Sequence, residues 1–295
     1  MNRTEQHDMK VITRIAPSPT GKMHIGTVRT ALFNYAFAKH HGGTFYIRIE
    51  DTDKERNKEE WVDAIWNDFE WCGLTPDTKY VQSQHLARHR ELLHGLVESG
   101  KAYESEEPAK DDPSRTVRVI RLRNPGTSVS FDDLIRGTVT FDTTELGDFV
   151  IARSIDDPLY HFAVVVDDGD TDVTHVIRAE EHISNTPRQI LIQEALGFPR
   201  PNYAHIPLIL APDRSKLSKR KHSASIDNYR ELGYEADAII NYLALLGWTP
   251  PSGKEILSLE EIVESFELSD VIHISKRPNR CRRKNLSLLN RRLSP

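Results

Sequence analysis

The stretch APSPTGKMHIG, from Ala16 to Gly26, combines residue types that suit the binding of a nucleotide phosphate. Its two prolines fix the backbone and remove two N–H donors, and Gly21 permits a tight turn that a ligand can approach closely. A helical pattern begins directly after His24, which therefore lies beside the free N–H groups and partial positive charge of a helix N-terminus. Such a terminus binds anions. An HIG triplet alone would indicate only a surface loop, but in this setting it predicts a phosphate site.

A second candidate is the basic stretch DRSKLSKRKHS, from Asp213 to Ser223, which has five Lys or Arg between Arg214 and Lys221. It follows the apolar run HIPLILAP, which is typical of a core strand. Open α/β sheets bind ligands in the loops that follow their strands, and lysines there suit the negative charge that develops on a leaving pyrophosphate. The alternative is an ordinary solvated basic loop.

The elements around the first stretch form a strand, helix and strand in sequence. A β-branched, alternating run at 11–17 predicts a strand, and apolar residues at helical spacing predict a buried helix that ends at the sequence HHGG. Gly42 or Gly43 can take the left-handed cap. The run TFYIRIED at 44–51 predicts the next strand. This βαβ unit implies a parallel sheet with a right-handed crossover.

The rest of the chain is predicted more coarsely. Helical patterns occupy 58–72 and 84–99, and a polar, acidic loop is expected at 104–115. Short alternating segments follow it, and parallel-sheet signals resume with YHFAVVVDD and VTHVIRAEEH. A helix is expected in TPRQILIQEALG and a strand in HIPLIL. From Ser225 the pattern is helical, with a capping box formed by Ser258 and Glu261.

Composition limits the class of protein. The chain has 295 residues, of which 38% are hydrophobic and 28% charged, so a packed core is expected. It has no apolar run of membrane-spanning length, and the N-terminus lacks the apolar stretch that a signal peptide would need, so none is expected. Cys72 and Cys281 are far apart, which favours a reducing compartment and argues against a cysteine-rich zinc site. The net charge is −5 although residues 276–295 hold eight Lys or Arg and no acid. The acidic remainder argues against sequence-independent nucleic-acid binding.

Several of these stretches carry a family resemblance. PSPTGKMHIG and KLSKR resemble the two signatures of class I aminoacyl-tRNA synthetases, and TRIAPSPTG, ALFNYAFAKHHGGTFYIRIEDTD, THVIRAEEHISNTPRQIL and NYLALLGW resemble bacterial glutamyl-tRNA synthetases. The likeness covers about Lys10 to Val271. It implies ATP-dependent activation of L-glutamate to glutamyl-adenylate and transfer to the 3′-terminal adenosine of tRNA(Glu). It also implies Mg²⁺ bound with ATP, no zinc, no membrane, and a cytoplasmic monomer.

The resemblance assigns roles residue by residue. The glutamate site would comprise Arg14, Ala16, Ser18, Glu50, Tyr160 and Arg178. The ATP site would comprise Pro17, Ser18, Gly21, His24, Gly26, Lys216, Ser218 and Lys219, with His24, Lys216 and Lys219 catalytic and no residue predicted as a metal ligand. Arg14 would pair with the substrate's side-chain carboxylate, and Glu50 would hold its ammonium group. Alternatives stay open: Arg14 as an exposed strand residue, Tyr160 as a core aromatic, and Arg178 salt-bridged to the adjacent AEE.

The resemblance also implies an α/β fold class. A Rossmann-like catalytic core would comprise 1–100 and 158–215, and an inserted acceptor-end-binding α+β segment would occupy 101–157. The signature loop and a helical stem-contact region would follow at 216–271, before a basic atypical tail at 272–295. The inserted segment is shorter than in most relatives and lacks the cysteine cluster that some of them use for zinc.

The sequence also fits other functions. Full-length relatives continue into an anticodon-binding region, so the sequence fits a truncated or frame-shifted product, which we favour, or a stand-alone short relative such as a glutamyl-queuosine tRNA(Asp) synthetase. A small nucleotidyltransferase and a non-catalytic paralogue that binds tRNA or an amino acid are further alternatives. The basic tail would then be either a non-native terminus, which we favour, or a grip on tRNA phosphates.

Overall fold

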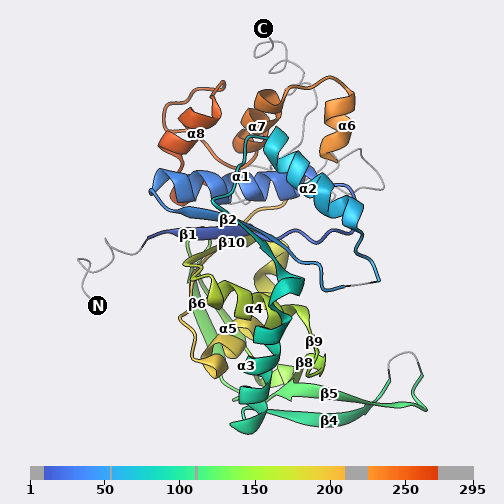
Figure 1. The fold of residues 1–295 in the computed structure, drawn as a ribbon. Helices are drawn as coiled ribbons and strands as arrows, with labels where there is room; N and C mark the ends of the chain where they lie inside the picture. Colours follow the sequence, from blue (N-terminus) through green and yellow to red (C-terminus); the bar gives the residue numbers. More distant parts are fainter. Residues whose placement is uncertain (1–9, 54, 110–111, 210–224, 272–295) are drawn as a thin grey trace.

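Three parallel strands form the first part of the central sheet (Figure 1). The computed structural model describes residues 10–53, 55–109, 112–209 and 225–271. Their order is β1-β2-β3, and Arg14 of β1 is paired in register with Tyr46 of β2. The strands are β1 (Ile12–Ile15), β2 (Thr44–Ile49) and β3 (Thr78–Val81). Helix α1 (Ile25–His40) connects β1 to β2, which confirms the predicted βαβ unit.

Two glycines end α1 and return the chain to the sheet. Gly42 has a φ of +63°, the left-handed conformation predicted for the cap. At Gly43 a Cβ atom would lie 2.1 Å from the carbonyl oxygen of Val11. Because that carbonyl accepts a hydrogen bond from the Thr44 N–H at 2.8 Å, the close approach belongs to the pairing of β1 with β2, and only glycine fits there.

A second group of strands lies beside β1. Strand β10 (His175–Ala179) pairs in parallel with β11 (Asn202–Ile206), which in turn pairs with β6 (Ser128–Asp133), and β6 is antiparallel to β7 (Gly137–Asp142). The Thr174 N–H donates to the Ile12 carbonyl at 3.0 Å, so β10 adjoins β1. The carboxyl ends of β1 and β10 therefore meet at one edge. Strands β6 and β7 of this group come from the segment 101–157. The domain boundaries given above stay a prediction.

An antiparallel sheet holds the segment predicted as an acidic loop. Its strands are β4 (Ala102–Pro108), β5 (Thr116–Leu122), β8 (Phe149–Ser154) and β9 (Asp157–Pro158), and the β4–β5 hairpin extends from the body in Figure 1. The loop prediction was wrong for 104–108. Glu104 and Glu106 lie on the exposed face of this strand, and Glu106 pairs across the hairpin with Arg118 at 3.1 Å. Cross-strand charge pairs of this kind stabilise a hairpin.

The run YHFAVVVDD is a helix and not the predicted strand. It forms α4 (Tyr160–Asp170), whose residues from Phe162 to Asp168 are all buried. Short apolar runs do not distinguish a buried helix from a buried strand, and tertiary packing here outweighs the β-propensity of the three valines. This helix brings the Asp168 carboxylate into contact with Arg14 of β1 and Arg48 of β2.

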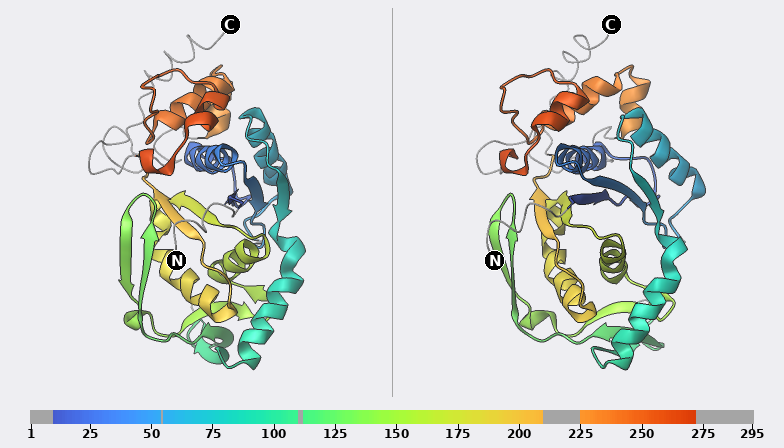
Figure 2. Two further views of the ribbon diagram at one scale, coloured as in Figure 1. Left: turned by 90° about the vertical axis from the view of Figure 1, so that its left-hand side faces the viewer. Right: turned by 60° about the vertical axis from the view of Figure 1, so that its left-hand side comes forward.

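The remaining helices cover the sheet. Three of them pack on the side of α1 away from the strands, as Figure 2 shows. The last of these three helices begins with the predicted capping box of Ser258 and Glu261. They are α6 (Ile226–Glu231), α7 (Ala236–Leu245) and α8 (Leu259–Ser265). The others are α2 (Glu59–Trp71), α3 (Leu86–Glu98) and α5 (Thr186–Leu196), with 3₁₀ turns η1 (Gln82–His85), η2 (Thr144–Leu146), η3 (Glu180–Asn185) and η4 (Leu268–Asp270). In the described part of the chain, every helix is too short or too polar to cross a membrane.

Candidate active site

A cavity of about 540 Å³ opens where the carboxyl ends of β1 and β10 meet the N-terminus of α1. Ligands bind at such an edge because the strands on either side send their following loops in different directions. Most of the residues predicted from the sequence line it together. They are Arg14, Ala16, Pro17, Ser18, His24, Gly26, Glu50, Tyr160 and Arg178. Gly21 is not among the lining residues, and Lys216, Ser218 and Lys219 lie outside the described residues.

His24 caps the helix that faces the cavity. It has extended backbone geometry, and its Nδ1 accepts the Gly26 N–H at 2.9 Å. An accepting Nδ1 places the proton of a neutral ring on Nε2, which is then the nitrogen that can donate. A Cβ atom at Gly26 would lie 3.0 Å from Nδ1, so glycine leaves room for this cap. Gly21 has a φ of +147°, and glycine is required there by the turn that precedes the helix.

Arg14 is bound to a carboxylate that the sequence analysis did not identify. Its Nε and Nη2 donate to the two oxygens of Asp168 at 3.0 and 3.1 Å. Arg48 donates to the same carboxylate at 2.6 Å and to Glu50 at 3.1 Å. Although burial alone would raise it, the two guanidinium groups hold the pKa of Asp168 below its usual value. Arg14 is thus a buried, paired residue that keeps only Nη1 without an acceptor among the described residues.

Glu50 follows β2 and is buried at the base of the cavity. The Pro17 carbonyl accepts its backbone N–H at 3.0 Å, which ties it to the turn before α1. Burial raises the pKa of this carboxyl to about 7, with Arg48 opposing that shift and Asp167 adding to it. At neutral pH the group is therefore shared between its two protonation states, and a cation beside it would favour the ionised one.

Arg178 is buried, and its hydrogen-bond partners in the described part of the chain are uncharged side chains. Its Nε donates to His205 at 3.1 Å, its Nη1 to Gln189 at 2.6 Å and its Nη2 to Thr186 at 2.9 Å. Among the described residues no carboxylate pairs with it, and burial lowers its pKa. The alternative that Arg178 is salt-bridged to the adjacent AEE was wrong, because Glu180 pairs with Arg136.

A short chain of hydrogen bonds fixes the Arg178 guanidinium. His205 Nδ1 lies 2.6 Å from a carboxylate oxygen of Asp133. Because an ionised carboxylate can only accept, Nδ1 donates to it, and the Nε2 of His205 accepts the hydrogen bond from Arg178. Although burial opposes it, the His205 bond holds the pKa of Asp133 below its usual value. The chain joins the ends of β6, β11 and β10. Sequence reasoning missed Asp133 and His205 because their pairing depends on strands far apart in the chain.

The cavity wall contains two further side chains of interest. Tyr160 begins α4 and is 44% exposed, so it is not a core aromatic. His182 also lines the cavity, and burial, followed by the charge of Arg178, lowers its pKa to about 4 although the Glu181 carboxylate opposes that shift. It is therefore a neutral ring at physiological pH. The cavity thus offers a carboxylate for an ammonium group, guanidinium N–H groups for an anion, and a helix N-terminus for a phosphate.

Comparisons with known proteins agree on one family. The family of tRNA synthetases class I (E and Q), catalytic domain, matches residues 10–112 and 104–288. A glutamate–tRNA ligase of Aquifex aeolicus (strain VF5) is 47% identical across 89% of this chain and 63% of its own length. One from Hydrogenobaculum sp. (strain Y04AAS1) is 44% identical across 88% and 64%. The chain therefore spans less than two thirds of these curated relatives.

Solved structures show the same likeness. The crystal structure of a glutamate tRNA ligase from Elizabethkingia meningosepticum CCUG26117, in complex with its amino acid, superposes with a TM-score of 0.89 at 31% identity. The match covers 96% of this chain and 69% of that one. Glutamate-tRNA synthetase from Elizabethkingia anophelis superposes with a TM-score of 0.88, also at 31% identity, over 96% and 70%.

Proposed function

The chain belongs to the class I tRNA synthetases of the glutamate and glutamine type, and on that premise we propose that it activates L-glutamate with ATP and charges tRNA(Glu). The observation that carries the proposal is the cavity at the ends of β1 and β10, which combines Arg14, Glu50 and Arg178 with the capped N-terminus of α1. Family membership also supports tRNA as the macromolecular partner and a cytoplasmic monomer as the working form.

The amino acid would lie across the base of the cavity. Its ammonium group would bind Glu50, which gains full ionisation from a neighbouring positive charge. Its side-chain carboxylate would lie against Arg178 and the Nη1 atom of Arg14, the guanidinium positions that are not held by an acidic residue. Tyr160 at the start of α4 would close one side, and Ala16 and Ser18 would contact the backbone of the substrate.

ATP would enter as its magnesium complex and bind along the turn from Pro17 to Gly26. The N–H groups of the first turn of α1 and the Nε2 of His24 would bind the phosphate charge there, because His24 and Gly26 line the cavity. In the proposed first step an oxygen of the glutamate α-carboxylate attacks the α-phosphorus, the bond to the bridging oxygen breaks, and pyrophosphate leaves with the electron pair. The residues act mainly by positioning and charge stabilisation.

The second step would move the glutamyl group to tRNA. A ribose hydroxyl of the 3′-terminal adenosine attacks the acyl carbon of the adenylate, AMP leaves, and an ester forms as the hydroxyl proton is lost. Lys216, Ser218 and Lys219 lie outside the described residues, and their role on the pyrophosphate stays a prediction from the KLSKR signature.

The test is exchange of labelled pyrophosphate into ATP, with and without tRNA(Glu), in the presence of glutamate, glutamine or aspartate. We expect exchange that requires L-glutamate. Arg178→Ala should need at least a hundredfold more glutamate for the same exchange rate, whereas Arg118→Ala, on the exposed β4–β5 hairpin, should not. Absence of exchange under every condition would overturn the proposal, and charging of tRNA(Asp) alone would point to the glutamyl-queuosine class.

A further inference from the structure

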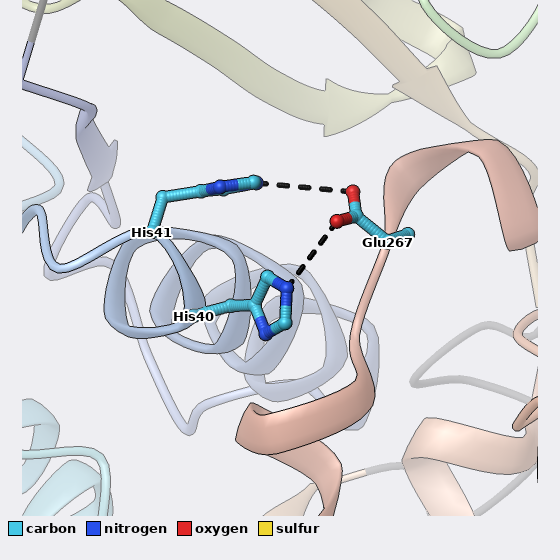
Figure 3. A group of neighbouring side chains, drawn as sticks. All are labelled: His40, His41 and Glu267. Atoms are coloured by element: carbon cyan, nitrogen blue, oxygen red, sulfur yellow. Dashed lines mark ion pairs between the residues drawn. The ribbon is translucent and has the colours of Figure 1, made fainter. Parts of the chain in front are cut away.

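Two histidines at the end of α1 face one glutamate from a different part of the chain. His40 is the last residue of α1, His41 is its C-cap, and Glu267 lies in the segment between α8 and η4. Figure 3 shows both imidazoles directed at the carboxylate. The His40 Nε2 lies 3.3 Å from one oxygen of Glu267 and the His41 Nε2 lies 3.8 Å from the other.

The hydrogen bond on the other side of His40 fixes which nitrogen faces the glutamate. Its Nδ1 lies 2.8 Å from the Val263 carbonyl oxygen, which can only accept, so Nδ1 carries a proton. In a neutral ring Nε2 then presents a lone pair to the carboxylate of Glu267. Two lone pairs 3.3 Å apart repel unless a proton or a cation lies between them. Metal-binding histidines characteristically donate their other ring nitrogen to a backbone carbonyl in this way.

The three ligand atoms also have the spacing of a metal site. They all lie within 4.8 Å of one another. Tetrahedral zinc with bonds of 2.0 to 2.1 Å places its ligands about 3.3 Å apart, close to the two distances to Glu267. Two imidazoles and one carboxylate are a ligand set that zinc and its neighbours in the first transition row prefer.

The end of the helix favours this arrangement. Adjacent helical residues normally point in different directions, but the C-cap backbone of His41 departs from the helix, with φ −90° and ψ 14°. The ring of His41 packs on Phe37 with centroids 4.5 Å apart, which holds it beside His40. The helix C-terminus carries partial negative charge, which stabilises a cation. All three side chains are partly exposed, so water can complete the coordination.

We propose that His40, His41 and Glu267 form a binding site for one divalent transition-metal ion, zinc first among them. The ion joins the C-terminus of α1 to the segment after α8. It lies at the opposite end of α1 from His24, roughly 24 Å away at 1.5 Å per residue, and so has a structural role apart from the cavity. The sequence analysis predicted no metal ligand, since two adjacent histidines and a distant glutamate form no recognisable motif.

The test is titration of the metal-free full chain with Co²⁺, followed by displacement with Zn²⁺. We expect one site with the visible absorption of tetrahedral cobalt. His41→Ala and Glu267→Gln should each weaken binding at least tenfold, whereas His94→Ala, an exposed histidine on α3, should not. Zinc should raise the melting temperature of the unchanged protein and of His94→Ala, and should not do so in the other two variants.

X-ray absorption of the zinc-loaded, unchanged protein gives a second measurement that does not depend on any variant folding. Two imidazole ligands with oxygen completing the shell would support the proposal. Sulfur in the shell would overturn it, because the site contains no cysteine. Absence of a stoichiometric site, or equal binding by all four proteins, would overturn it as well.

Discussion

Glutamate affinity should rise about tenfold between pH 6 and pH 8 because binding requires Glu50 in its ionised form. The pKa of Glu50 in the empty cavity is about 7, so about one tenth of the groups are ionised at pH 6 and about nine tenths at pH 8. A bound ammonium group lowers that pKa, and binding then releases the proton. The association constant follows the ionised fraction as long as the pKa in the complex lies below 6.

Other groups near Glu50 do not produce this dependence. His182 is neutral throughout the range because its pKa is about 4. Arg48 on β2 keeps its charge because, although burial opposes it, the carboxylates of Asp168, Glu50 and Asp167 raise its pKa, and the carboxyl of Asp168 has a pKa below its usual value. Free glutamate also keeps both carboxylates and its ammonium group ionised between pH 6 and pH 8. Glu50 is therefore the group expected to titrate.

Isothermal titration with glutamate checks this directly. Measured in buffers of different ionisation enthalpy, the number of protons released per glutamate should approach one at pH 6 and fall towards zero at pH 8. Glu50→Gln should bind glutamate more weakly at pH 8 and lose the dependence on pH. A flat affinity for the unchanged protein, or a tenfold rise that survives in Glu50→Gln, would refute the reasoning.

Three further predictions concern the cavity residues Arg178 and Glu50 and the KLSKR lysine Lys219. Arg178→Ala should raise the KM for glutamate at least a hundredfold, or about 3 kcal/mol, because it removes the proposed partner of the substrate's side-chain carboxylate. Steady-state exchange kinetics measure this KM. Lys219→Ala should slow adenylate formation about a hundredfold with nearly unchanged glutamate affinity, as single-turnover kinetics would show. The folded-state pKa of Glu50 lies above its unfolded value, so stability falls as pH rises from about 4.5 to 7. Glu50→Gln should remove that loss and make the ligand-free protein up to about 3 kcal/mol more stable at pH 8, measured by urea unfolding.

The parts of the fold that the sequence predicted are those with local signals. Strand β1, helix α1 and strand β2 are adjacent in the chain, and their periods of two and 3.6 residues are clear. The glycine cap and the capping box of Ser258 and Glu261 are also local, and the structure contains both. In contrast, the first half of the segment at 104–115 was predicted as a loop because its glutamates gave no strand signal. Its pairing with β5 supplies the stability that the local sequence does not.

The parts of the site that were missed depend on contacts across the fold. Asp168 is 154 residues from Arg14. Because the segment that forms α4 was predicted as a strand, the direction of the Asp168 side chain could not be predicted. Asp133 reaches His205 only because β6 pairs with β11. Neither contact has a periodicity or motif that a single sequence displays. The roles assigned by resemblance placed single residues at the cavity, but the structure supplies the partners that set their charge.

Those partners bear on which arginine would select glutamate over glutamine in the proposed function. The sequence analysis gave this role to Arg14, whose charge is already balanced by a bidentate contact with Asp168. Arg178 is held by three neutral side chains and has no acidic partner among the described residues. A buried guanidinium without a counterion gains most from a ligand that brings a carboxylate, and a neutral amide leaves that charge uncompensated. Selectivity is therefore expected to depend more on Arg178 than on Arg14. In the proposed binding mode the substrate's ammonium group would complement Glu50 in the same way, so an amino acid with an acidic side chain would balance both charges.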